Sequence, residues 1–311
     1  MTWLYITLGA LAVALITLAV LYHIAFYVKP KRMKVPLSMP PKSLERRMKD
    51  SDMKYTLGLV REIVELEHEK VFIRSFDGLK LAGRYYGFVP GAPLAILCHG
   101  YRSMSAADFR CIFQKVRSLG LNILLISERS HWESEGRSIT LGVKEKRDIK
   151  AWADYAADRF PGTPIVLYGV SMGAASVLSS TVLGLPAGVK CIVADCGFSS
   201  PDAIMRKVIK GLKLSFLYPA VKLSARLFAG FSLDEPGAIE AVKHTDLPIL
   251  FIHGENDDFV PCEMSREMFE AAAGEKRLFT FPGAAHLHSC LSDEKRYLGI
   301  LDDFLNAYLK N

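Results

Sequence analysis

A short apolar strand that runs into a serine flanked by glycines is the feature that most constrains this chain. Residues 165–170 are mostly Ile, Val and Leu, as in the buried strands of parallel sheets. Gly-Val-Ser-Met-Gly occupies residues 169–173 and leads into small, helix-forming residues, which fits the G-x-S-x-G pattern in a strand–turn–helix context. The glycines permit a kink too tight for side chains, and this kink lifts the hydroxyl of Ser171 above the sheet. The N–H of Met172, at the start of the helix, can then face a developing oxyanion.

The rest of the chain alternates short apolar strands with helices of about a dozen residues. A β-hairpin with Asp77-Gly78 at its turn comes first. Further strands are expected at 94–98, 122–127, 165–170, 190–194, 248–252 and 277–281, and helices at 55–69, 106–119, 145–159, from 172 onward, 261–273 and 294–308. Because such units are joined by right-handed crossovers, the sequence predicts an α/β fold with one mostly parallel sheet covered by helices on both faces.

The N-terminal segment predicts a membrane anchor. From Trp3 to Val28 the chain carries no charged side chain, and this run is longer than the roughly 20 residues that cross a bilayer as a helix. A secretory signal peptide has a basic start and a shorter apolar core, and this segment has neither. Aromatic residues gather towards its ends, as they do at membrane interfaces. We therefore expect residues 1–28 to form a single transmembrane helix.

The net charge of +6 is concentrated directly after this segment. Residues 29–49 hold eight Lys or Arg and one acid, which leaves the remainder of the 311-residue chain at −1. Residues 29–54 therefore read as a basic, Pro-containing linker that suits anionic headgroups, and the positive-inside rule places a catalytic domain at 55–311 in the cytoplasm. A nearly neutral globular part argues against nucleic acid as a partner. The six cysteines lack paired spacing, which argues against a disulfide scaffold or a zinc site.

An exposed serine at such a kink needs a base and an acid that orients the base. The loop after the strand at 277–281 offers His286 and, two residues on, His288. Three carboxylates also follow strands, namely Asp257, Asp258 and Asp195. Since open α/β sheets place their ligand sites at the carboxyl ends of strands, all of these are candidates.

On these motifs the chain resembles α/β-hydrolases of the serine esterase and peptidase type, and most of all the membrane-anchored hydrolases of bacteria. The resemblance runs from about residue 71 to the C-terminus. It implies Asp257 as the triad acid, from the fifth position of an H-G-x-x-D-x-x-V-P element, with Asp258 and Asp195 as second and third choices. It implies His286 as the base, from a G-x-x-H element, with His288 a weaker candidate.

The same resemblance implies an oxyanion hole. His-Gly-Tyr at residues 99–101 matches the oxyanion-loop motif, so the N–H of Tyr101 is expected to join that of Met172. One loop departs from the family pattern D-x-R-G-H-G-x-S, because Ser130 and Trp132 stand where that pattern has glycines. The departure puts the conformation of that loop in doubt.

Residues 198–246 are too long for an ordinary connection between sheet elements. Their apolar residues predict a small helical cap over the site. A basic face on this cap suggests a position near an anionic membrane surface and entry of apolar acyl groups. The basic residues are Arg206, Lys207, Lys210, Lys213, Lys222 and Arg226.

Together these features predict a single-pass membrane hydrolase that cleaves ester or thioester bonds through an acyl-enzyme on Ser171. Its expected partners are a small acyl ester or thioester substrate and the lipid bilayer, and no metal or cofactor is implied. A serine peptidase or aminopeptidase of the same fold is the alternative. A non-catalytic binding protein is a weaker one, because such proteins usually lack a triad member and this chain retains all three candidates.

Overall fold

The computed structural model describes residues 1–29 and 50–309, and the side chains of the second range from residue 57 onward. The predicted linker at 29–54 therefore lies mostly outside the described residues. Its last residues begin α3 (Asp50–Glu65).

One eight-stranded sheet forms the centre of the molecule, in the order β1-β2-β4-β3-β5-β6-β7-β8. Only β2 runs against its neighbours, and every other pairing is parallel, which confirms the predicted mostly parallel α/β sheet. In this register Gly169 of β5 lies between Cys98 of β3 and Ala194 of β6, at the middle of the sheet. The strands are β1 (Glu69–Arg74), β2 (Lys80–Tyr86), β3 (Leu94–Cys98), β4 (Asn122–Ile126), β5 (Ile165–Val170), β6 (Val189–Asp195), β7 (Ile249–Gly254) and β8 (Lys276–Phe281).

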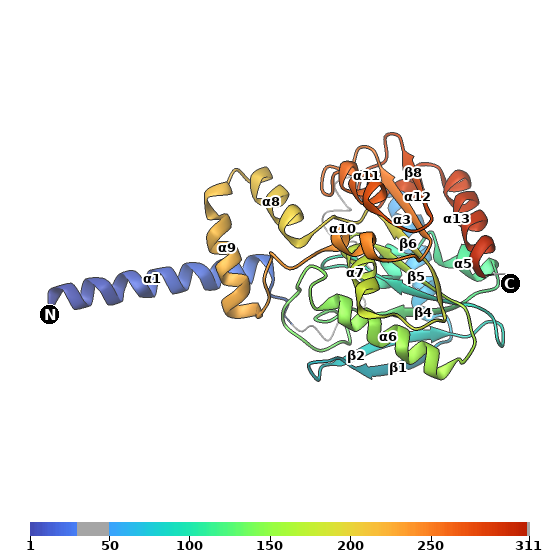
Figure 1. Ribbon diagram of the computed structural model, residues 1–311, viewed down its shortest axis with the longest axis horizontal. Helices are drawn as coiled ribbons and strands as arrows, with labels where there is room; N and C mark the ends of the chain where they lie inside the picture. Colours follow the sequence, from blue (N-terminus) through green and yellow to red (C-terminus); the bar gives the residue numbers. More distant parts are fainter. Residues whose placement is uncertain (30–49, 310–311) are drawn as a thin grey trace.

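Helices cover both faces of the sheet, because both faces of its central strands are apolar. The first face carries α6 (Glu145–Arg159), α7 (Met172–Ser180), α10 (Ala238–Ala241) and α11 (Cys262–Ala271). The second carries α3, α4 (Ser105–Asp108), α5 (Phe113–Ser118), α12 (Ser289–Ser292) and α13 (Glu294–Leu309). The alternation of side chains along each strand thus divides the core into two layers (Figure 1).

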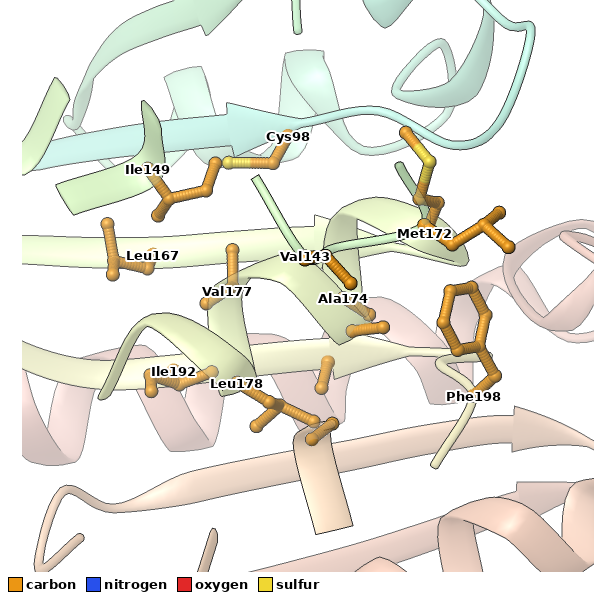
Figure 2. Close-up of a cluster of buried hydrophobic side chains, with 14 of the residues drawn as sticks. Cys98, Val143, Ile149, Leu167, Met172, Ala174, Val177, Leu178, Ile192 and Phe198 are labelled. Carbon is orange, nitrogen blue, oxygen red and sulfur yellow. The ribbon is translucent and has the colours of Figure 1, made fainter. Parts of the chain in front are cut away.

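The helix after the kink is pressed into the first of these layers. Figure 2 shows Val177 and Leu178 of α7 close to Leu167 and Ile192 of the sheet. Every residue of α7 is buried, including Met172 at its first position. The side chain of Met172 therefore anchors the start of α7 in the core.

Two predicted helices differ in their bounds. The single helix predicted at 106–119 is wrong: α4 and α5 are separate, because the N–H of Ile112 bonds the carbonyl of Phe109, three residues back, in place of a regular helical bond. The helix predicted at 55–69 ends at Glu65, since the chain already pairs in the sheet from Glu69.

The region predicted as a cap is helical. We call its projecting part the cap helices: α8 (Pro201–Gly211), η2 (Ser215–Leu217), α9 (Tyr218–Ser224) and η3 (Ala225–Ala229). After these the chain returns through α10 and η4 (Val242–His244), and α10 packs against α7.

The N-terminal helix α1 (Thr2–Ala25) projects from the body, with α9 beside its inner end (Figure 1). Among the described residues it is the one helix that is long and apolar enough to cross a membrane. Residues 2–17 are all exposed, whereas Leu18 is buried and Phe26, just after the helix, has no exposed surface. α1 is therefore free along its outer part and docked at its inner end.

Candidate active site

Ser171 lies at a sharp turn between β5 and α7. Its backbone has φ 53° and ψ −117°, a left-handed conformation that is costly for a residue with a side chain. A Cβ on Gly173 would lie 2.1 Å from the carbonyl oxygen of Cys98, and one on Gly169 would lie 2.4 Å from the backbone of Gly173. The turn therefore requires both glycines, and the N–H of Ser171 ties it to β6 through the carbonyl of Asp195 at 2.8 Å.

The structure brings together Ser171, His286 and Asp257, which lie far apart in the sequence. Nε2 of His286 is 3.0 Å from Oγ of Ser171, and Nδ1 of His286 is 2.6 Å from Oδ2 of Asp257. Since a carboxylate only accepts, Nδ1–H donates to Asp257, and Nε2 is left to accept the proton of the hydroxyl. This is the geometry of a nucleophile, a base and an orienting acid.

The carboxylate of Asp257 is fixed from several sides. Oδ1 accepts the N–H groups of Phe259 and Val260 at 3.0 and 2.8 Å. Nε2 of His253 lies 3.3 Å from Oδ2, and its Nδ1 bonds the hydroxyl of Ser265 at 2.7 Å. Burial raises the pKa of Asp257, but the hydrogen bonds from His253, His286 and Val260 outweigh it and hold that pKa well below its usual range. Asp257 is therefore ionised at neutral pH, as an acid that stabilises an imidazolium must be.

The other candidates occupy different positions. Asp195 is buried under the turn, where its Oδ2 accepts the hydroxyl of Tyr297 at 2.6 Å, and burial raises its pKa to about 6. Asp258 follows Asp257, and its backbone oxygen accepts from Nζ of Lys207 at 3.1 Å. His288 precedes α12, where its backbone N–H bonds the carbonyl of Ala285 at 3.0 Å. It is Asp257 and not its neighbour that bonds the imidazole of His286.

The predicted oxyanion loop lies against Ser171. A Cβ on Gly100 would lie 3.2 Å from Cβ of Ser171, a tight contact that the absence of a side chain at residue 100 relieves. Met172 is the first residue of α7, and its N–H has no acceptor within the helix. The N–H of Tyr101 likewise has no acceptor among the residues that the structure describes. These are the two amides that the sequence proposes as oxyanion donors.

Asp108 of α4 holds the oxyanion loop in place, and sequence reasoning missed it. Its Oδ2 accepts the N–H of Gly100 at 2.8 Å, and its Oδ1 accepts the hydroxyl of Ser103 at 2.6 Å. No local motif marks this aspartate. Its position inside a predicted helix, beside the loop it bonds, was the one available signal.

Two buried histidines join the oxyanion loop to the loop after β4. Nε2 of His99 accepts the N–H of Glu128, and Nε2 of His131 accepts that of Arg102, both at 3.1 Å. Burial lowers the pKa of His99 to about 4 and that of His131 to about 3, so both rings are neutral and able to accept. Despite lacking the family's glycines, the loop after β4 takes positive φ at Ser130 and Trp132. The two residues that replace the glycines therefore both adopt the left-handed backbone conformation that glycine favours.

One group of metal-ligand atoms exists within the described residues. Atoms of Cys196, Asp257 and His286 lie within 4.8 Å of one another. Burial raises the pKa of the Cys196 thiol well above its usual range, so the thiol stays protonated. The other two residues are already bonded to each other, so this donor set suits proton transfer better than metal binding.

Comparison with known proteins supports the same class. Residues 167–288, a range that contains all three clustered residues, match the model of the FSH1 serine hydrolase family. The structure is similar to the Pyrococcus furiosus esterase Pf2001, with 24% identity and a TM-score of 0.67 over 92% of this chain and 99% of that one. It is also similar to Est1E from Butyrivibrio proteoclasticus with bound ferulic acid, with 20% identity and a TM-score of 0.61 over 78% of this chain and 100% of that one. The protein therefore has the fold of the α/β-hydrolases, and its resemblance to a serine hydrolase family covers residues 167–288.

Two bacterial proteins are similar in sequence. YqkD of Bacillus subtilis (strain 168) is 22% identical over 97% of this chain and 96% of its own length. Rv2307c of Mycobacterium tuberculosis (strain H37Rv) is 29% identical over 76% of this chain and 78% of its own length. The likeness to YqkD therefore includes most of α1.

Proposed function

We propose that the protein is a membrane-anchored serine hydrolase that cleaves carboxylic ester or thioester bonds through an acyl-enzyme on Ser171. The observation that carries the proposal is the hydrogen-bond chain Asp257–His286–Ser171 at the carboxyl end of the sheet, beside two unbonded backbone amides. Residues of these types in this order are the parts that acyl transfer requires.

The reaction follows from this arrangement. Oγ of Ser171 attacks the carbonyl carbon while Nε2 of His286 takes the hydroxyl proton, and Asp257 stabilises the imidazolium that forms. The oxyanion accepts the N–H groups of Tyr101 and Met172, each worth about 3 kcal/mol in comparable sites. The C–O or C–S bond then breaks, the leaving group takes the proton from His286, and the acyl group stays on Ser171. Water, deprotonated by His286, attacks the acyl ester, and the acid leaves as the serine regains its proton.

A fluorophosphonate probe on the full chain tests the enzyme assignment. Ser171→Ala should lose all labelling, because the probe reacts only with an activated serine. Ser180→Ala is the matched control, since it removes another buried hydroxyl from the same helix. Labelling that survives Ser171→Ala would refute the assignment, and wild-type protein that takes no label would favour the binding protein.

The choice between esterase and peptidase needs matched substrates. Of the two solved neighbours compared above, Pf2001 is named an esterase and Est1E holds a carboxylic acid, ferulic acid, which supports an ester or thioester substrate. We expect kcat/KM on acyl esters and thioesters to exceed that on aminoacyl anilides by about 100-fold or more. A higher kcat/KM on aminoacyl anilides than on acyl esters would instead indicate an aminopeptidase of the same fold.

The inner end of α1 supports a retained anchor over a cleaved signal sequence. Phe26 is fully buried with its ring 5.3 Å from that of Phe231, and the hydroxyl of Tyr22 bonds that of Ser138 at 2.7 Å. The chain then pairs with the body, Val28 N–H to the carbonyl of Arg137 at 2.9 Å. Cleavage near residue 28 would strip these contacts from the hydrolase domain. Intact mass of the membrane-extracted protein should therefore include residues 1–28, and a mass lacking them would contradict the anchor.

The basic residues that follow α1 in sequence support a cytoplasmic catalytic domain. Protease added to sealed, right-side-out cells or spheroplasts should leave the domain intact and digest it after lysis. Digestion of the domain before lysis would show that it lies outside the cytoplasm.

A further inference from the structure

We propose that the cap helices are themselves inserted into the lipid bilayer beside α1, so that a lipid-borne acyl ester reaches Ser171 from the membrane. This inference rests on the proposed anchoring by α1 and on the proposed ester hydrolysis. It goes beyond both, because it assigns a membrane-binding surface to residues 201–229 and a source to the substrate.

The length of α1 is the first argument. At about 1.5 Å per residue its 24 residues span about 36 Å, enough for a hydrocarbon core about 30 Å thick. Leu18 is the first residue of α1 that is buried against the body, however, and the free part before it, residues 2–17, spans about 24 Å. The free part is short by about 6 Å, roughly one helical turn. A tilt of α1 would increase this shortfall, so the structures packed against its inner end must enter the bilayer as well.

The cap helices lie at that depth. Counting about 20 residues from Trp3 brings the inner boundary of the hydrocarbon core to Tyr22. The ring of Tyr22 lies 5.6 Å from that of Phe228 in η3, so this part of the cap meets the boundary. Figure 1 shows α9 crossing α1 near the inner end of α1, where the two helices are in contact.

The cap helices carry the side chains that such a position requires. Phe216 is 75% exposed and Leu227 is 56% exposed, although both are large and apolar. They belong to a group of exposed apolar residues, Leu212, Leu214, Phe216, Leu223, Leu227 and Phe228. An apolar group of this kind on an otherwise polar surface marks a membrane or protein contact, and its continuity with α1 commits it to lipid.

Charge supports the same partner. Between Pro201 and Ala229 there are six Lys or Arg and a single acid, Asp202. Arg206, Lys222 and Arg226 line an open cleft of about 440 Å³ together with Tyr218, Pro219 and Leu223. Because Arg206 pairs with Asp202, and Lys222 and Arg226 pair with Asp234, the three other lysines of the cap helices are the cations left for anionic headgroups, at about 1 kcal/mol each.

The cap helices and the inner end of α1 also border the active site. Nζ of Lys207, on α8, bonds the backbone oxygen of Asp258, next to the triad acid. On the other side, the hydroxyl of Tyr101 bonds the carbonyl of Ala25 at the end of α1, at 2.7 Å. The site therefore lies between the cap helices and the anchor, where an acyl chain leaving the lipid reaches it without crossing bulk water.

Cysteine labelling in vesicles tests the insertion. Leu227→Cys and Phe216→Cys are made in the full chain, reconstituted in vesicles with anionic lipid, and treated with a water-soluble maleimide. Peptide-resolved mass spectrometry separates the new cysteines from the six native ones, and each rate is normalised to the same variant unfolded in denaturant. Leu15→Cys on the free part of α1 is the reference for a side chain buried in lipid. Val182→Cys, 48% exposed on η1 (Thr181–Leu183) beyond the far end of α7, is the aqueous reference.

We expect the two cap cysteines to react at least tenfold more slowly than Val182→Cys and at a rate close to that of Leu15→Cys. Protection of Leu15→Cys with rapid reaction of both cap cysteines would overturn the insertion and leave the anchor standing. Rapid reaction of Leu15→Cys would instead overturn the anchor itself.

An activity ratio tests the source of the substrate. Leu227→Asp should lower turnover of a long-chain ester embedded in vesicles about tenfold relative to a short soluble ester, because the charge resists insertion. Val182→Asp, the matched surface change, should leave the ratio unchanged. An unchanged ratio in Leu227→Asp would refute entry of the substrate from the lipid. Wild-type protein that hydrolyses neither ester would instead refute the proposed hydrolase activity.

Discussion

The two sides of the active site are built in different ways. Ser171, Asp257 and His286 follow the ends of β5, β7 and β8, and their positions are set by the sheet, by glycines and by backbone bonds between strands. The oxyanion loop after β3 depends on side chains that lie outside the sheet, among them Asp108 and His131. We call the first group the sheet side and the second the oxyanion side. The core of the fold fixes the residues of the sheet side, whereas peripheral contacts, each of which a single substitution can remove, fix those of the oxyanion side.

The difference also explains why one side of the site depends on the N-terminal helix α1. Nη2 of Arg102 donates to the carbonyls of Ile24 and Tyr27 at 2.8 and 3.1 Å, and Tyr101 donates to that of Ala25. The last carbonyls of a helix have no partner within it, so they are available to these donors. The inner end of α1 therefore supports the loop that carries Tyr101, one of the two proposed oxyanion donors.

The largest expected effect is on the sheet side. Asp257→Asn should lower kcat by about 10⁴-fold, because the amide no longer fixes the tautomer of His286 or stabilises its charge. Asp258→Asn and Asp195→Asn are the controls and should stay within tenfold of wild type, as neither carboxylate bonds His286. Steady-state kinetics on one chromogenic ester measures all three. A loss with Asp258→Asn as large as that with Asp257→Asn would reassign the acid.

Gly173→Ala tests how rigidly the sheet holds the turn. The new Cβ would lie 2.1 Å from the carbonyl oxygen of Cys98, backbone that cannot move away, so we expect a loss of about 3 kcal/mol or more in unfolding free energy. Gly299→Ala on α13 is the control. Nothing lies within 4 Å of its Cβ, so it should stabilise the protein by about 0.5–1 kcal/mol. Denaturant titration gives both values, and equal midpoints would contradict the steric account.

The sheet side was largely predictable from sequence for physical reasons. The apolar strands, the glycines around Ser171 and the loops ending in Asp257 and His286 are local patterns, and each follows from the conformation or chemistry of a few neighbouring residues. The mostly parallel sheet followed from the alternation of strands and helices, whereas the order of its strands was not predicted. The triad roles stay a proposal that the activity measurements test.

The oxyanion side was not predictable to the same degree. Asp108, the last residue of α4, accepts the N–H of Gly100 and lies just before the break that separates α4 from α5 within the predicted helix. The contacts of Tyr101 and Arg102 use backbone carbonyls of residues more than 70 positions away. A backbone carbonyl carries no residue-type signal, so only the folded chain reveals that α1 and this loop meet.

A smaller effect on the sheet side concerns Asp195. The folded pKa is raised to about 6, above the ordinary value near 3.9, so the folded state holds a proton that the unfolded chain releases. Unfolding free energy should therefore fall as pH rises from about 4 to about 6 through this group. Asp195→Asn keeps an oxygen for Tyr297 and removes the buried charge. The increase in unfolding free energy caused by Asp195→Asn should be near zero at pH 4 and about 2 kcal/mol at pH 8. Denaturant titration at both pH values measures it. An equal increase at both would contradict burial of the charged carboxylate as its cause.

The smallest expected effect falls on the oxyanion side, where Arg102 meets the end of α1. Arg102→Ala removes two hydrogen bonds from an exposed guanidinium, worth about 1 kcal/mol together, so kcat should fall about fivefold. KM and the pH profile should not change, because the loop binds the transition-state oxyanion and carries no titrating catalyst. Arg102→Lys keeps a cation that can donate to the same carbonyls and should restore most of kcat, which a merely structural loss would not predict. A rise in KM with constant kcat would show that the loop positions substrate instead. If kcat does not change in Arg102→Ala, the inner end of α1 supports the body of the protein but not its chemistry, and the contrast between the two sides of the site would rest on Asp108 and His131 alone.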